Sequence, residues 1–293
     1  MNQRVLDHYL EFSIFTNPGL YKNYLKTLPD EVKELGELLR KNFVHRSTLH
    51  AGNVGTNADM KYGDMKEMPW WRQAEDDNLT TTAAMIAEFF RRDEKGLTPE
   101  KKVEDKLVLT CRYVAILMVS ILKTKGIPAR VRSGFAGYFE NTKDSWDHWI
   151  TQYWSTSENR WITVDVDGSW HRTGFDMYDI PEGKFDFSAQ TWLGVRKGEM
   201  SENHFRNAGG FDGLIAIVWA LFYDFHCIMN NEILYLHHPE LTMYGNFPKL
   251  PADKLKEMDD LATLMINPEG NFDKLRDIWE TKKEFRLLKG ALL

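Results

Sequence analysis

The sequence predicts an α+β protein in which one buried helix packs on an antiparallel sheet, with helical extensions at the N- and C-terminal ends. Three observations indicate this class. A strongly apolar helix begins at Cys111, strand-like segments follow it directly, and amphipathic helical patterns occupy both ends of the chain. A length of 293 residues is enough for a sizeable core.

The predicted central helix has well-marked ends. The residues that follow Cys111 are apolar on nearly every side, which is typical of a buried helix. Thr110 fits the N-cap position, so Cys111 would be the first helical residue, where the backbone N–H groups and the helix dipole favour a thiolate. Gly126 is placed to end the helix, and Pro128 prevents its continuation.

The strands predicted after this helix alternate their side chains between two faces and span residues 129–138, 147–154 and 161–168. The polar segment between the last two predicts a hairpin. Pairing Trp154 with Trp161 places His148 opposite Asp167, whereas centring the hairpin one residue earlier places it opposite Asp165. Both aspartates lie on the face of His148, so both are candidates to orient it.

The N-terminal flank is predicted to be helical over residues 1–46. Pro29 marks a helix start, and the apolar face that follows consists of Val32, Leu35, Leu38, Leu39 and Phe43. Asn78 is expected to cap the next helix. Residues 47–71 look like a loop, and His45, just before it, could line a cleft together with His50, Trp70 and Trp71. A surface histidine and a packing tryptophan are the commoner cases.

The C-terminal flank is predicted to contain an irregular cover over residues 171–210, a buried helix at 211–236, and amphipathic helices at 253–265 and 271–288. We therefore divide the chain into a helical N-terminal extension (1–95), a catalytic core (96–200) and a helical C-terminal extension (201–293), which together form one compact unit.

Composition excludes several classes of protein. The net charge of −6 comes without a dense basic block, so we expect no nucleic-acid partner. No apolar run reaches the length of a membrane span, and no signal peptide is recognisable at the N-terminus, so we expect a cytoplasmic protein without a membrane partner. Two cysteines cannot build a four-thiolate zinc site, and we expect neither a metal nor a cofactor.

Three residues form the candidate catalytic site: Cys111, His148 and Asp165. A thiol at a helix start, a histidine that takes its proton and a carboxylate that orients the histidine are the parts of cysteine-based acyl transfer. Asp167 remains the alternative to Asp165. Cys227, in an apolar helix, is interpreted as a core residue.

The segments around these residues resemble the transglutaminase-like superfamily. They read TCRYVAILMVSILKTKGIPARVRSGF, DHWITQYW and RWITVDVDG. In that family an apolar helix follows the cysteine and ends in a Gly-Ile-Pro-Ala-Arg turn, an aromatic residue follows the histidine, and a strand that begins with tryptophan precedes the aspartate. The resemblance covers roughly residues 105–170, and the flanks look similar to stand-alone bacterial members of the family.

The resemblance implies a papain-like core and a cysteine-dependent reaction at amide bonds of peptide-like substrates, by a protease, amidase or transamidase. Cys111 would attack the carbonyl, His148 would protonate the departing amine, and Asp165 would hold the imidazole. The alternative is a non-catalytic binding or scaffold module that keeps the fold. The sequence names neither the substrate nor the oligomeric state.

Overall fold

The computed structural model describes residues 1–46, 68–72, 74–139, 143–168, 173–235 and 237–289. They divide into two compact units. One unit comprises residues 9–131 and 150–180, and it contains Cys111 (here the cysteine unit); the other comprises residues 1–8, 132–149 and 181–293. Helices and strands both contribute, so the mixed α+β class predicted from the sequence is confirmed.

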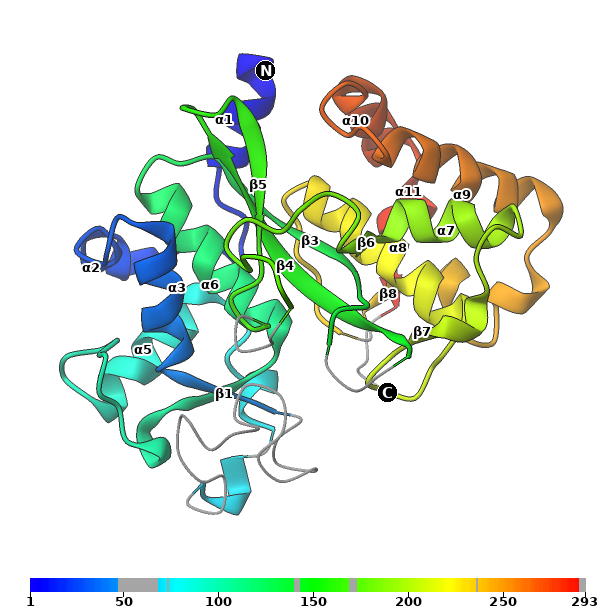
Figure 1. Ribbon diagram of the computed structural model, residues 1–293. Helices are drawn as coiled ribbons and strands as arrows, with labels where there is room; N and C mark the ends of the chain where they lie inside the picture. The colour runs from blue at the N-terminus through cyan, green and yellow to red at the C-terminus, as the bar shows by residue number, and fades with distance from the viewer. Residues whose placement is uncertain (47–67, 73, 140–142, 169–172, 236, 290–293) are drawn as a thin grey trace. The chain divides into compact units, whose positions relative to one another are not determined.

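The centre of the cysteine unit is helix α6 (Cys111–Thr124), in which every residue is buried. Helices α2 (Lys22–Leu25), α3 (Val32–Arg40) and α5 (Thr82–Arg92) pack around it, as Figure 1 shows. The helix ends as predicted: Gly126 adopts a positive φ of 80°, and Ile127 N–H donates back to the Leu122 carbonyl at 3.0 Å. The buried helix expected from the apolar pattern is therefore present.

A short parallel strand pair precedes this helix, and it corrects one prediction. Phe43 belongs not to a helix but to strand β1 (Phe43–His45), which pairs in parallel with β2 (Leu107–Leu109). The helical spacing ends with α3, because Phe43 and Val44 are buried instead through the pairing with β2. Val44 and Val108 share an apolar cluster with Met68 and Val103.

The main sheet has the strand order β5–β4–β3–β6, with β7 pairing in parallel with β4. Its bounds are β3 Ala129–Ala136, β4 Ser145–Ser155, β5 Arg160–Val164, β6 Asp186–Phe187 and β7 Phe205–Arg206. Trp154 pairs with Trp161, so the first of the two predicted hairpin registers is correct. Strand β5 ends at Val164, before either candidate aspartate.

The other unit is built on helix α8 (Leu214–Ile228), which is almost wholly buried, as the apolar run predicts. Helix α7 (Ser188–Arg196) packs on α8 and on α9 (Ala252–Met265). The prediction of an irregular cover over 171–210 is wrong at α7. Its polar Ser188 bonds to the buried carboxylate of Asp224, which also pairs with Arg132 of β3 at 2.7 Å, so tertiary contacts stabilise a helix with little periodicity.

The remaining elements follow the predicted flanks with small shifts. Thr81, not Asn78, caps α5, because its hydroxyl accepts a hydrogen bond from Ala84 N–H at 3.2 Å. The other helices and strands are α1 Gln3–Leu10, α10 Phe272–Thr281, α11 Lys283–Arg286, β8 His238–Pro239 and β9 Leu288–Lys289. Within the described residues, no helix combines the length and the apolar character needed to cross a bilayer.

A glycine in β3 tests the pairing of β3 with β6. A Cβ at Gly134 would lie 2.3 Å from the Asp186 carbonyl oxygen, so Gly134→Ala must push β6 away. We expect the free energy of unfolding, measured by urea denaturation, to fall by about 1–3 kcal/mol. Gly245→Ala is the matched control, because its Cβ meets no atom within 4 Å. Equal stability of the two variants would contradict the described pairing.

Candidate functional site

The β1–β2 pair places a histidine beside the start of helix α6. In its register His45 lies opposite Leu109, and the next backbone N–H, from Arg46, donates to the Leu109 carbonyl at 2.9 Å. Cys111 follows Leu109 by two residues and is the first residue of α6. Thr110 occupies the N-cap position as predicted, with an extended backbone, although its side chain makes no capping hydrogen bond.

Three potentially reactive side chains meet at this point. One donor atom each of His45, Cys111 and Asp167 lies within 4.8 Å of the other two. The His45 Nε2 atom is 3.5 Å from Asp167 Oδ2. Cys111 is 7% exposed, and the side chains of Asp167 and His45 are 8% and 19% exposed. The cluster therefore holds a thiol, an imidazole and a carboxylate in a largely desolvated setting, where their interactions are strong.

Asp167 is held in this cluster by its backbone. The guanidinium of Arg40, fully buried at the end of α3, donates from Nη1 to the Asp167 carbonyl oxygen at 2.5 Å. Within the described part of the chain, the buried Oδ1 atom of Asp167 has no hydrogen-bond partner. A carboxylate oxygen left in this state costs free energy unless something binds it.

Acidic residues of a neighbouring turn add negative charge near His45. Asp76 and Asp77, in the 3-10 helix Glu75–Asp77, contact the Arg46 guanidinium at 2.9 and 3.1 Å. Burial raises the pKa of Asp76 to about 6, although Arg46 and, more weakly, His45 lower it. The carboxyl of Asp76 thus changes charge near pH 6, in electrostatic reach of the cluster.

Asp165, the predicted orienting acid, lies in the turn after β5. Its Oδ1 atom accepts a hydrogen bond from Gly168 N–H at 2.7 Å, and its own N–H donates to the Met177 carbonyl at 2.9 Å. A Cβ at Gly168 would fall 2.1 Å from Asp165 Oδ2. The turn therefore admits only glycine at residue 168 while the Asp165 carboxylate keeps this orientation.

His148, the predicted base, lies in β4 and is 2% exposed. Its ring meets Phe139 edge-on, with 4.9 Å between ring centroids. The structure brings Cys111 together with Asp167 and with His45, which the sequence suggested only as a cleft-lining residue. The pairing of His148 with Cys111, and of Asp165 with His148, stays a prediction.

Two other cleft candidates are solvent-exposed. Trp70 and Trp71, in the 3-10 helix Trp70–Arg72, are 77% and 69% exposed. Their rings meet edge-on, with 5.9 Å between ring centroids. They are surface residues, so the commoner interpretation as packing tryptophans is wrong. His50 lies outside the described residues.

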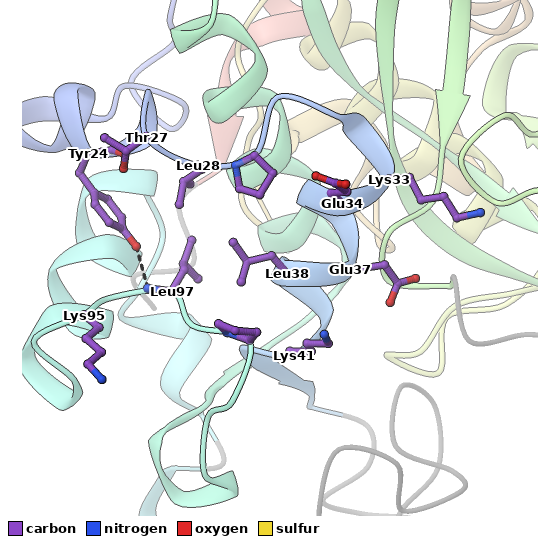
Figure 2. Close-up of a pocket in the computed structure, with 12 residues that line it drawn as sticks. Tyr24, Thr27, Leu28, Lys33, Glu34, Glu37, Leu38, Lys41, Lys95 and Leu97 are labelled. Carbon is purple, nitrogen blue, oxygen red and sulfur yellow. Dashed lines mark hydrogen bonds between the residues drawn. The ribbon is translucent and has the colours of Figure 1, made fainter.

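A hollow of about 780 Å³ occurs elsewhere in the cysteine unit. Figure 2 shows Leu28, Leu38 and Leu97 facing into it, and the Tyr24 hydroxyl accepting a hydrogen bond from Leu97 N–H at 2.7 Å. None of the cluster residues lines this hollow. The hollow is therefore separate from the cluster of His45, Cys111 and Asp167.

Comparison with known protein families finds a match over part of the chain. Residues 81–166 match the family model of the transglutaminase-like superfamily. The match runs from the cap of α5 to just beyond β5, and it includes Cys111, His148 and Asp165. No curated protein and no solved structure matches the chain. This segment, less than a third of the chain, is therefore similar to the transglutaminase-like superfamily.

Proposed function

We propose that the protein catalyses cysteine-dependent acyl transfer at amide bonds of peptide-like substrates. The observation that carries the proposal is the position of Cys111. It begins a buried helix, next to the imidazole of His45 and the carboxylate of Asp167. The positive end of a 14-residue helix stabilises a thiolate, which is the nucleophilic form of cysteine.

The reaction divides into two steps. His148 takes the proton of the Cys111 thiol, and the sulfur attacks the carbonyl carbon of the amide, forming a C–S bond. The C–N bond then breaks, and the amine leaves with a proton from His148. Asp165 holds the imidazole in the tautomer that makes this transfer work, as the family pattern implies. Water or a second amine then attacks the thioester and gives a proton to His148. The C–S bond breaks, and the sulfur of Cys111 takes that proton back.

The identity of the acceptor decides the class of enzyme. Water as acceptor makes the protein a thiol protease or an amidase, whereas an amine makes it a transamidase. The site residues proposed here use no cofactor for either outcome, because the nucleophile, the base and the orienting acid all come from the chain. We place the reaction in the cytoplasm, where Cys111 stays reduced.

The reactivity of the thiol can be measured without knowing the substrate. In the presence of EDTA near neutral pH, we expect iodoacetamide to alkylate Cys111 faster than Cys227, which is fully buried in α8. His148→Ala should slow alkylation of Cys111 at least about tenfold, because the thiol loses its proton acceptor. Mass spectrometry of the labelled peptides over time gives both rates.

Two variants serve as comparisons for that experiment. His204→Ala changes an exposed histidine and should leave the rate unaltered. His45→Ala tests the imidazole that lies beside the thiol. Slow, equal labelling of both cysteines would contradict a thiolate-forming site. If the rate of Cys111 alkylation falls in His45→Ala but not in His148→Ala, the base is His45.

Gly168 gives access to the role of Asp165 without changing a charge. Gly168→Ala places a methyl carbon 2.1 Å from Asp165 Oδ2, so the carboxylate must turn away. We expect Cys111 alkylation to slow at least about tenfold, as it should in Asp165→Asn, because the imidazole loses its orienting acid. Gly245→Ala is the matched control. If Asp167→Asn slows alkylation, and Gly168→Ala and Asp165→Asn do not, Asp167 is the orienting acid.

The reaction itself can be identified with a library of glutamine-containing peptides, incubated with and without a primary amine. We expect turnover that disappears in Cys111→Ser, because the thioester cannot form. Mass spectrometry distinguishes cleavage by a protease, a gain of about one mass unit by a deamidase, and an amine adduct by a transamidase. Turnover that survives in Cys111→Ser would exclude the proposed mechanism.

A further inference from the structure

We infer that His45, Cys111 and Asp167 form a binding site for a zinc ion, in which the Cys111 thiolate is one of the metal ligands. The three residues come from β1, from the start of α6 and from the turn after β5, and their donor atoms lie within 4.8 Å of one another. No spacing motif in the sequence connects them, so the site follows from the fold alone.

The distance between the imidazole and the carboxylate is close to the spacing of two ligand atoms bound to one metal ion. His45 Nε2 and Asp167 Oδ2 are 3.5 Å apart, which is longer than the usual N–H···O hydrogen bond of about 2.7–3.2 Å. Tetrahedral zinc, with bonds of about 2.0–2.2 Å to nitrogen and oxygen, holds such atoms roughly 3.4 Å apart. Because the sulfur lies within 4.8 Å of both atoms, it needs to approach by at most roughly 1 Å, which a small side-chain rotation provides.

The chemistry of the donors selects the metal. One imidazole nitrogen, one thiolate sulfur and one carboxylate oxygen are a typical zinc ligand set, whereas magnesium and calcium prefer oxygen ligands alone. Three protein ligands leave the fourth tetrahedral position for water or for a substrate atom. Binding replaces the proton of the Cys111 thiol, which passes to solvent.

The surroundings of Asp167 support the same assignment. Its side chain is 8% exposed, yet Oδ1 has no hydrogen-bond partner among the described residues. Arg40 fixes the backbone of this residue from within the core, at 2.5 Å from the carbonyl oxygen. A buried carboxylate with a rigid backbone and an unsatisfied oxygen is already prepared to bind a cation.

Zinc at this position would block acyl transfer, because the metal and the amide carbonyl compete for one sulfur atom. This inhibitory consequence rests on the proposed function, whereas the binding of zinc does not. The metal can therefore be tested by spectroscopy and mass measurement even if no amide substrate is turned over.

The first test uses Co²⁺ as a spectroscopic substitute for zinc on the full-length protein. We expect one equivalent to bind with the visible spectrum of a tetrahedral site and a thiolate-to-metal charge-transfer band, and Zn²⁺ to displace it. Cys111→Ser should abolish the band. His45→Ala and Asp167→Asn should each weaken the affinity for Co²⁺ more than about tenfold, because loss of a residue that only supports a metal ligand already weakens affinity by about 10–100-fold. His204→Ala and Asp212→Asn are the matched controls, with unchanged affinity expected.

A second measurement needs no variant, in case a buried substitution prevents folding. In the wild-type protein, Zn²⁺ should protect Cys111 from iodoacetamide at least tenfold, and EDTA should restore labelling. Protection confined to Cys111, as mapped by peptide mass spectrometry, supports the site. Binding that depends on Cys227, that persists in both folded His45→Ala and Asp167→Asn, or that leaves Cys111 labelling unchanged would overturn it.

Discussion

The complete burial of helix α6 is the constraint on which the rest of the cysteine unit depends. A helix without an exposed face must be covered on all sides, and α2, α3 and α5 supply part of that cover. Its charged residues must be satisfied there as well: Lys123 donates to the Glu11 carbonyl at 2.7 Å, and the Arg112 guanidinium lies over the Phe15 ring at 5.0 Å. Burial fixes the first residue, Cys111, in one position, as the proposed role of a nucleophile requires.

Local sequence patterns predict the elements that local forces determine. The ends of α6 follow from Thr110 and Gly126. The alternation of side chains predicts the β4–β5 hairpin but leaves two registers open, and the structure has the one that pairs Trp154 with Trp161. Strand β1 escaped prediction because Phe43 also satisfies the helical spacing of α3, while its partner β2 lies far along the chain. Helix α7 escaped because its contacts with other helices, rather than periodicity, stabilise it.

The candidate site shows the same division. Cys111 is recognisable because a helix start has a sequence signature, and the motifs around His148 and Asp165 can be matched to a family. The place of His45 beside the thiol depends on a parallel pairing that no short pattern encodes. The alternation of side chains along a strand makes Asp167 the alternative to Asp165, and in the structure the imidazole near Asp167 is that of His45.

The β1–β2 pairing has a consequence for the order of events during synthesis. Joining Phe43 to Leu107 closes a loop of roughly 60 residues, at an entropic cost of about 4 kcal/mol, whereas α6 can form from neighbouring residues alone. Asp167 leaves the ribosome later still, when more than half of the 293 residues have been made. The nascent chain thus carries Cys111 as an ordinary thiol, and the sulfur acquires its partners only once the surrounding core has closed around it.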